Sequence, residues 1–159
     1  MLALSVAATS SPVLVGHVLF GANEMVGDFV KSLIPQMSGK EFDDDYRALG
    51  VVLRGQLVGG VVFSKYSGFN IHFSCAFKQV GWARRETLRT LFSFPFVQLD
   101  CVRLTATTGR KNKVARKALT DVGFTHEGVC RRGYDGREDA FIYGMLKEQC
   151  KWLGNKNGS

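Results

Sequence analysis

The segment KQVGWARR, at residues 78–85, combines the residue types of an anion-binding turn. A β-like run ends before it, Gly81 allows the chain to turn, and a helix-like run follows. The first N–H groups of a helix have no partner inside the helix, and the helix dipole makes that end positive. Gly81 and Ala83 would let an anion approach the backbone, and three cations flank them: Lys78, Arg84 and Arg85. We predict a pyrophosphate site here; the alternative is a structural glycine beside a solvated helix face.

A second informative segment, at residues 112–128, begins a helix-like run at Asn112 and ends it at Gly123. Asn is a preferred helix N-cap, and Gly is a preferred stop. We expect Asn112 to cap the helix and to present its amide to the same ligand. Phe124, directly after the glycine, is expected to pack in the core beneath that ligand.

The first segment resembles the signature of the GNAT acyltransferase superfamily, Arg/Gln-x-x-Gly-x-Gly/Ala. Gly81 and Ala83 match this signature, whereas Lys78 stands in the Arg/Gln position. Trp82, the phrase FPFVQLD and the closing KEQCKWL are also similar to small GNAT-like proteins of bacteriophages. The resemblance covers the chain from its first helix-like run to Leu146.

The second segment resembles the same superfamily more specifically. Ala115 and Leu119 follow Asn112, and Glu127-Gly128 follows the Gly-Phe pair, in a spacing similar to the branch that acetylates the N-termini of ribosomal proteins. The resemblance implies a GNAT fold of the α/β (α+β) class, with a mixed, mostly antiparallel sheet of six or seven strands flanked by helices. It also implies one acyltransferase domain over residues 1–150, followed by a polar tail over residues 151–159.

The resemblance further implies acetyl-CoA (coenzyme A) as the cofactor and an amine as the acceptor, for which a protein or peptide α-amine is one option. The residues expected to bind acetyl-CoA are Phe77, Lys78, Gly81, Trp82, Ala83, Arg84, Arg85, Asn112 and Phe124.

Attack of an amine on a thioester needs a neutral amine, a donor for the developing oxyanion and an acid for the leaving thiolate. Many members of the superfamily place a Tyr acid in the helix before Gly-Phe, where this sequence has Leu119. We consider Tyr134 as a substitute acid, with Tyr66 and Tyr143 as alternatives. Glu127 and His72 are candidate bases, with His126 as an alternative. A role in packing or at the surface stays open for each of these side chains.

A site without a strong base favours α-amines, because their pKa near 8 leaves more neutral amine at pH 7 than a lysine pKa near 10.4 does. The acidic segment EFDDD, residues 41–45, would then attract a basic peptide or polyamine. The alternative is an ordinary solvated loop.

Hydrophobic periodicity predicts the elements that must position these residues. Helical spacing predicts helices over residues 23–34, 82–94 and 112–122. Runs rich in Val, Phe and Leu predict an antiparallel meander over residues 46–55, 56–66 and 68–77. Further strands are predicted over residues 102–107, 124–130 and 140–146. This order predicts a mixed sheet with helices packed on its faces.

The charge is uneven along the 159 residues. Residues 1–77 carry 5 Lys/Arg against 6 Asp/Glu, whereas residues 78–159 carry 16 against 8. The second half therefore suits a phosphate-rich cofactor or a nucleic acid, and charge alone does not choose between them. The aromatic residues lie mostly at helix-core spacing, so we do not expect nucleic acid as the partner.

Four separated cysteines without C-x-x-C pairs predict reduced thiols and no metal site. No apolar run approaches the length of a membrane span. We expect a cytoplasmic protein, in the host cytoplasm if a phage encodes it, and a monomer or homodimer. Two alternative functions stay open: a catalytically inactive GNAT-like protein that binds a host or partner protein, and a nucleic-acid-binding module.

Overall fold

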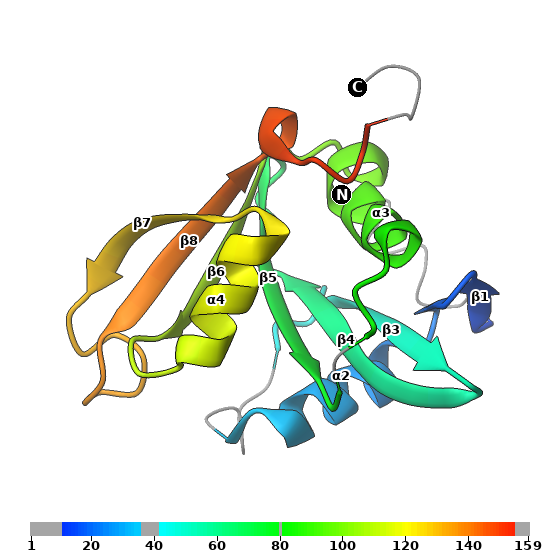
Figure 1. Cartoon of the computed structure of the whole chain (residues 1–159), viewed down its shortest axis with the longest axis horizontal. Coiled ribbons are helices and arrows are strands. Elements are labelled where there is room, and N and C mark those ends of the chain that lie inside the picture. The colour runs from blue at the N-terminus through cyan, green and yellow to red at the C-terminus, as the bar shows by residue number, and fades with distance from the viewer. Residues whose placement is uncertain (1–10, 36–41, 80, 155–159) are drawn as a thin grey trace.

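The computed structural model describes residues 11–35, 42–79 and 81–154, which form one mixed β-sheet with helices on both faces (Figure 1). The sheet has the strand order β1-β2-β3-β4-β5-β6-β8-β7. Its strands are β1 (Val13–Val15), β2 (Val18–Phe20), β3 (Arg47–Leu53), β4 (Gln56–Ser64), β5 (Asn70–Phe77), β6 (Arg103–Gly109), β7 (Thr125–Cys130) and β8 (Ala140–Leu146). The helices are α2 (Asn23–Leu33), α3 (Arg85–Ser93), the π-helix η3 (Phe94–Gln98), α4 (Lys113–Val122) and the 3₁₀ turn η4 (Lys147–Gln149).

The mixed, mostly antiparallel sheet is confirmed, but it has eight strands where six or seven were expected. The additional pair is the β1–β2 hairpin, which turns at Gly16 with φ +59°. Each of its strands has only three residues, and Val13, Leu14 and Val15 are all exposed. A strand this short and this exposed shows no alternation from which to predict it.

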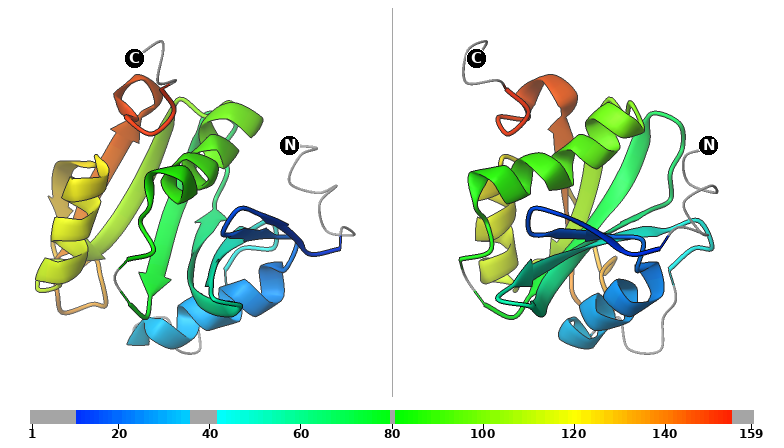
Figure 2. Two further views of the ribbon diagram at one scale, coloured as in Figure 1. Left: turned by 45° about the vertical axis from the view of Figure 1, so that its right-hand side comes forward. Right: turned by 90° about the vertical axis from the view of Figure 1, so that its right-hand side faces the viewer.

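The helices cover the two faces of the sheet differently (Figure 2). Helix α2 packs Val26 and Val30 against Ala48 of β3 and Val62 of β4, and we call this the α2 face. Helices α3 and α4 lie on the other side, the α3–α4 face, over a core that includes Phe63, Phe73, Phe92, Phe96 and Phe124. Fully burying one such side chain contributes roughly 1.5–3 kcal/mol, so this larger cluster dominates the stability of the sheet.

The ends of the helices follow local chemistry. Helix α2 ends at Leu33, shortly before Pro35, because the residue before a proline avoids helical dihedral angles. Helix α4 begins after its N-cap Asn112 and ends at Gly123, which has φ +123°. Helix α3 begins at Arg85, three residues later than predicted, and its C-terminal end widens into the π-helix η3, which contains Pro95.

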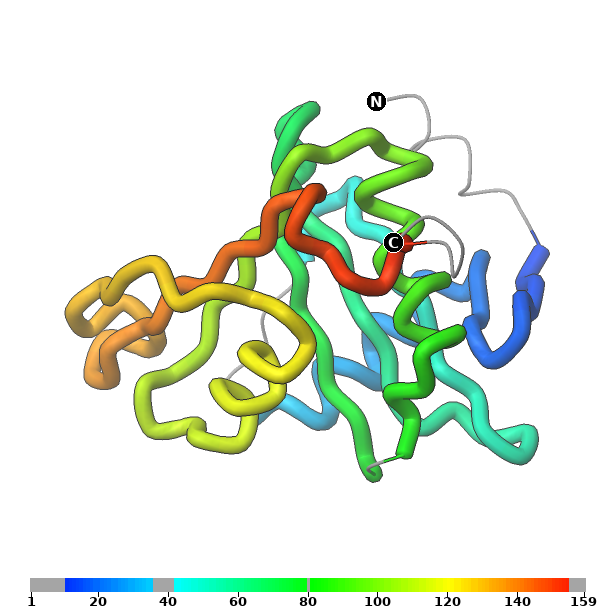
Figure 3. Tube along the Cα trace, turned by 45° about the horizontal axis from the view of Figure 1, so that its top comes forward, coloured from blue at the N-terminus to red at the C-terminus, as the bar shows by residue number. Residues whose placement is uncertain are grey.

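The chain after β8 returns to the domain (Figure 3). The indole N–H of Trp152 donates a hydrogen bond of 2.8 Å to the carbonyl of Val122, at the end of α4. Trp152 and Leu153 also pack against the core, so residues 151–154 do not form the start of a polar tail. Residues 155–159 of the expected tail lie outside the described residues.

Candidate active site between two diverging strands

The candidate site is the gap that opens where β5 and β6 diverge. These parallel neighbours pair at only three positions, from Asn70↔Arg103 to His72↔Thr105. Strand β5 then continues to Phe77 and β6 to Gly109 along separate paths (Figure 1). The backbone of β5 beyond His72 therefore has no strand partner on this side, and an extended ligand can hydrogen-bond to it.

The turn after β5 has the features of an anion site. Gly81 has φ +92°, and a Cβ atom placed on it would meet no atom within 4 Å. Arg84 is the N-cap of α3, and its side chain makes no capping hydrogen bond to the first turn. Gly81, Ala83, Arg84 and Arg85 are all exposed. The open N–H groups and the positive end of the helix dipole therefore face a space that an anion can enter.

Two of the expected cofactor residues pack on each other. The rings of Phe77 and Trp82 stack with centroids 3.6 Å apart and an interplanar angle of 2°. The Phe77 ring in turn lies where a side chain on Gly59 of β4 would collide with it. Glycine at position 59 thus makes room for this stack, which fixes the end of β5 and the start of the anion-binding turn.

The three cations of the turn do not form one cluster. The Lys78 ammonium lies 5.2 Å from the ring centroid of Phe29, against α2. One guanidinium nitrogen of Arg84 lies 3.5 Å from Nε2 of His17, in the β1–β2 hairpin. Arg85, the first residue of α3, is exposed. The structure thus places Arg84 and Arg85 at the open helix end, whereas Lys78 extends toward the α2 face.

Asn112 and Phe124 occupy the structural positions that the sequence predicts. The side-chain oxygen of Asn112 accepts a hydrogen bond of 3.0 Å from the backbone N–H of Ala115. Phe124 is buried, with its ring centroid 5.2 Å from Phe73 and 6.4 Å from Phe92. Phe124 therefore belongs to the core on the α3–α4 face, where it contacts Phe73 of β5, one of the two strands that border the gap.

The three candidate catalytic residues all lie on the α2 face. Ile71 and Phe73 of β5 point into the core on the α3–α4 face, so His72 between them points to the α2 face. The carboxylate of Glu127 lies where a side chain on Gly144 would collide with it. Tyr143 and Met145, on either side of Gly144, belong to the core on the α3–α4 face, so position 144 and the Glu127 carboxylate lie on the α2 face.

Tyr134 lies beside the end of β6. A Cβ atom on Gly109 would be 3.1 Å from its ring, and alternation along β6 places position 109 on the α2 face. Segments far apart in the sequence thus place His72, Glu127 and Tyr134 on one face of the sheet, with Tyr134 at the end of β6 and His72 where β5 and β6 are still paired.

His72 sits at the last paired position before the strands diverge, opposite Ser64 of β4 and Thr105 of β6. Its pKa is lowered from the ordinary value by burial, and also by the nearby cations Lys65 and Arg103, against the opposing effect of Asp43. At neutral pH the imidazole is therefore neutral and able to accept a proton.

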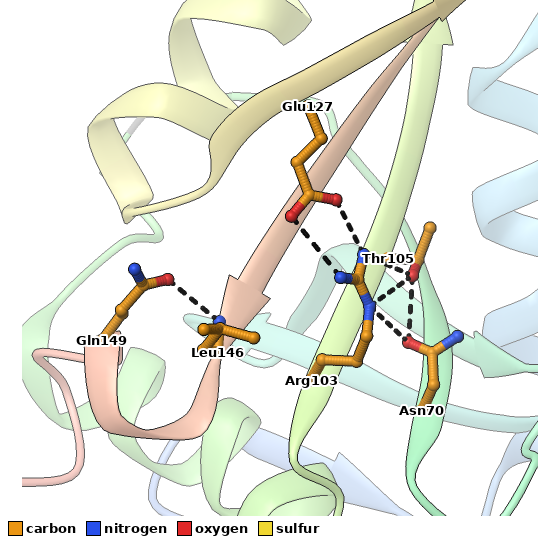
Figure 4. Close-up of polar contacts among 6 residues, drawn as sticks. All are labelled: Asn70, Arg103, Thr105, Glu127, Leu146 and Gln149. Carbon is orange, nitrogen blue, oxygen red and sulfur yellow. Dashed lines mark hydrogen bonds and ion pairs between the residues drawn. The ribbon is translucent and has the colours of Figure 1, made fainter.

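Glu127 makes a two-pronged ion pair with Arg103 (Figure 4). The two guanidinium nitrogens of Arg103 donate to its carboxylate oxygens at 2.9 and 3.4 Å. A bulge in the β7–β8 ladder at His126/Gly128 accommodates Glu127. Because both oxygens are engaged by a permanent cation, this carboxylate is poorly placed to take a proton from a substrate.

Tyr134 is the tyrosine best placed to act as an acid. Burial raises its pKa, and the carboxylates of Glu138 and Asp135 raise it further, so the phenol keeps its proton at neutral pH. The alternatives have other roles: Tyr66 donates a hydrogen bond to the carbonyl of Leu99, and Tyr143 is buried in the core. His126, the alternative base, packs against Phe141 and Tyr143.

The acidic segment lies on the side of α2, and Glu41 in it is outside the described residues. The Asp43 carboxylate accepts hydrogen bonds of 3.2 and 3.3 Å from the backbone N–H of Lys65, so it has a structural role. Asp44 lines a cavity of about 690 Å³ at the start of α2, together with Glu24 and Asp28. Part of the acidic segment therefore remains available to attract a cation.

Sequence reasoning did not single out Asn70, Arg103, Thr105 and Gly144. Alternation in VRLTAT places Arg103 and Thr105 on one face of a strand. Their proximity to Asn70 and Glu127 depends on the strand order, which no local pattern reveals. The fold alone reveals these partners.

A thiol group also lies beside the candidate site. Burial raises the pKa of the Cys75 thiol, on the open part of β5, to about 12, so it is not a nucleophile at neutral pH. No three metal-ligating side chains gather within residues 11–35, 42–79 and 81–154. In the same part of the chain no helix is long and apolar enough to cross a bilayer.

Comparison with known proteins yields similarity of structure alone. No protein-family model and no curated protein sequence matches the chain. Among solved structures, it is similar to the ribosomal-protein-S5-alanine acetyltransferase from Vibrio fischeri, with a TM-score of 0.62, 13% identity, and coverage of 89% of this chain and 100% of that one. An acetyltransferase (GNAT family) from Bacillus anthracis gives a TM-score of 0.60, 18% identity, and coverage of 87% and 99%.

Mycobacterium smegmatis RimJ in complex with CoA-disulfide gives a TM-score of 0.56 and 19% identity over 67% of this chain and 55% of that one. The chain therefore has the GNAT fold.

Proposed function

We propose that this protein is an acetyl-CoA-dependent N-acetyltransferase. The observation that carries the proposal is the gap between β5 and β6, which lies beside an uncapped helix start at Gly81. An extended chain that ends in a pyrophosphate needs both features: free strand backbone for its amides, and open N–H groups for its phosphates. Two of the solved structures named above are acetyltransferases, and the third, RimJ, holds CoA-disulfide.

The residues around the gap fit coenzyme A. The open space at Gly81 leaves room for phosphate oxygens, and Arg84 and Arg85 offer charge-assisted contacts from the exposed helix start. The Phe77–Trp82 stack would form an apolar wall, and Asn112 lies at the start of α4 on the same side of the sheet. Bound acetyl-CoA would supply the thioester that the amine attacks.

The acceptor amine would reach the gap from the α2 face, on which the candidate catalytic side chains lie. His72 would take the proton that the amine nitrogen loses as it bonds to the carbonyl carbon. Tyr134 would donate its proton to the sulfur as the carbon–sulfur bond breaks, and solvent would restore the phenol. A backbone N–H group on the unpaired edge of β5 would donate to the developing oxyanion. Glu127, engaged by Arg103, would not serve as the base in this scheme.

We infer that a protein or peptide α-amine is the preferred acceptor class. A histidine whose pKa is lowered is a weak base, and it suits an amine that is already partly neutral at pH 7. The carboxylates of Glu24, Asp28 and Asp44 would attract a basic residue near the reacting amine.

A two-part experiment tests the proposal. Thermal unfolding with and without coenzyme A should show stabilisation if the ligand binds the native state, by about 2.7 kcal/mol at a hundredfold excess over Kd. Thiol release from acetyl-CoA is then measured with a peptide library carrying free α-amines.

Neither stabilisation nor thiol release would refute the proposal. Stabilisation without thiol release on any amine would favour the alternative of an inactive GNAT-like binding protein.

A further inference from the structure

A polar cluster joins three strands at the point where β5 and β6 diverge (Figure 4). We call it the vertex cluster: Asn70 of β5, Arg103 and Thr105 of β6, and Glu127 of β7. Nε of Arg103 donates to Asn70 Oδ1 at 3.3 Å and to Thr105 Oγ1 at 3.2 Å, and a terminal nitrogen of Arg103 lies 3.1 Å from the same hydroxyl. The Thr105 hydroxyl itself donates to Asn70 Oδ1 at 2.9 Å. Arg103 therefore bonds to Asn70 in the first and to Thr105 in the last of the three paired positions of β5 and β6.

Glu127 reaches Arg103 only because Gly144 has no side chain. Strand β8 lies between β6 and β7 in the sheet, so the carboxylate must cross it. A Cβ atom on Gly144 would collide with all three carboxylate atoms of Glu127. The sequence thus combines a carboxylate on one strand, a glycine on the next and an arginine on the third.

The vertex cluster differs from an ordinary surface ion pair, which contributes little to stability. The side chains of Arg103 and Glu127 are 27% and 37% exposed, and the two-pronged contact continues into two further polar groups. Such a network holds its members in one geometry.

His72 is a direct neighbour of this cluster. It lies two residues after Asn70 on the same face of β5 and is paired with Thr105. The charged groups near its ring come from three other elements: Lys65 at the end of β4, Arg103 of β6, and Asp43 of the acidic segment.

We propose that Arg103 is a positioning residue for acetyl transfer: anchored by Glu127, it fixes the vertex of the gap and with it the placement of His72 beside the reacting amine. This inference rests on the proposed function. In this proposal Glu127 holds Arg103 in place. Gly144 contributes to the reaction because its missing side chain leaves room for the Glu127 carboxylate.

The most direct test is Gly144→Ala, which adds one methyl group and changes no ionisable residue. The three atoms nearest the new methyl group all belong to the flexible end of Glu127, so the variant should fold while its carboxylate leaves Arg103. Gly128→Ala in β7 is the matched control, because a Cβ atom there meets nothing within 4 Å. Arg103→Met and Glu127→Gln break the same ion pair from its two sides.

The first measurement is NMR of the Arg103 Nε–H and the His72 ring, without any acceptor. We expect the Arg103 Nε–H to be protected from solvent exchange in the parent protein and in Gly128→Ala, and to lose that protection in Gly144→Ala. In Arg103→Met the His72 ring should titrate at higher pH, because a nearby cation has been removed. An Arg103 signal and a His72 titration that stay unchanged in these variants would overturn the proposal.

The second measurement is steady-state acetyl transfer from acetyl-CoA to the α-amine peptide that gives the fastest thiol release. We expect kcat to fall roughly tenfold in Gly144→Ala, Arg103→Met and Glu127→Gln, with KM for acetyl-CoA changing less than about twofold, because misplaced groups lose rate before they lose cofactor binding. The double variant Arg103→Met/Glu127→Gln should be no slower than either single one, since both remove the same interaction. In Arg103→Met the acidic limb of the pH profile should move to higher pH.

A far larger loss in Glu127→Gln than in Gly144→Ala or Arg103→Met would show instead that Glu127 is the base, and would overturn the assignment. If the parent protein transfers acetyl to no amine, the proposed function fails, and the role of Arg103 in transfer fails with it. The NMR measurement distinguishes that case, because it tests the hydrogen bonds of the vertex cluster and the effect of Arg103 on His72 without any acetyl transfer.

Discussion

At the scale of single residues, two glycines make the candidate site possible for different reasons. Gly81 occupies a backbone conformation, φ +92°, that other residues rarely adopt, and it leaves open space beside the start of α3. Gly144 has ordinary dihedral angles, and it matters because the carboxylate of Glu127 occupies the place of its missing side chain. Mutations at the two positions should therefore affect different steps, ligand binding at Gly81 and the catalytic rate at Gly144.

The variant Gly81→Glu should abolish coenzyme A binding without unfolding the protein. The new side chain places bulk and negative charge where the pyrophosphate would meet the helix N-terminus. Isothermal titration with coenzyme A measures the effect. Gly68→Glu is the matched control, because Gly68 has φ +93° and the same open surroundings, so both variants carry the same backbone strain. Equal coenzyme A affinities in the two variants would remove the anion site from the turn.

His72 should make stability depend on pH. Its pKa is lowered in the folded state, so the unfolded chain takes up the proton more readily than the native protein does. The free energy of unfolding should therefore fall as the pH drops from about 6.5, the ordinary value of histidine, through the lowered pKa of His72. Urea unfolding at a series of pH values should show a shallower fall in His72→Gln than in the parent protein. The same pH dependence in both proteins would mean that His72 is not held in its neutral form by the fold.

At the scale of elements, α3 and α4 start differently, and the difference matches their expected roles. Asn112 caps α4 with its own side chain, whereas the side chain of Arg84, the N-cap residue of α3, makes no capping hydrogen bond. A helix end that is left uncapped at the surface keeps its N–H groups available to a ligand. The capped helix α4 instead stabilises the second wall of the gap, and its cap can be tested separately from the ligand.

Removing the cap in Asn112→Ala should cost about 1 kcal/mol of unfolding free energy, whereas Asn112→Ser should cost only a few tenths, because serine is also a good N-cap. Coenzyme A affinity is then measured in both variants. If the amide of Asn112 contacts the cofactor, Asn112→Ser should keep its stability and still lose affinity. An affinity equal to that of the parent protein would limit Asn112 to its capping role.

At the scale of the whole molecule, basic and acidic side chains are distributed unevenly. The excess of Lys and Arg lies in residues 78–159, which include the anion-binding turn and α4, and the acidic groups Glu24, Asp28 and Asp44 lie together beside α2. An anionic cofactor and a cationic acceptor would therefore be drawn to different parts of the surface. This arrangement supports the assignment of the α2 face to the acceptor.

In a mixed peptide library with acetyl-CoA at neutral pH, free α-amines should be acetylated faster than internal lysines. The reason is the larger neutral fraction of an α-amine combined with a weak base in the site. Peptides with Lys or Arg near the reacting amine should be preferred, and the preference should fade as salt screens the acidic groups. Mass spectrometry of the library measures both effects. Acetylation confined to internal lysines would indicate a dedicated strong base and would contradict the role given to His72.

The sequence by itself determined the elements with strong local signals. Helical periodicity located α2 and α4, and alternation with turn residues located the β3–β4–β5 meander, because these patterns depend on neighbours along the chain. The turn at Gly81 and the cap at Asn112 were predictable for the same reason, since both depend on local backbone chemistry. The β1–β2 hairpin was not, because strands of only three residues carry no periodicity.

Only the tertiary structure decided which side chains meet. The order β5-β6-β8-β7 brings Asn70, Arg103 and Glu127 together although long stretches of sequence separate them. The same order decided that Glu127 is paired with a cation while His72 stays neutral, because burial and neighbouring charge are properties of the folded surface. Residue types fixed which chemistry was available, and the sheet determined which of those residues face one another.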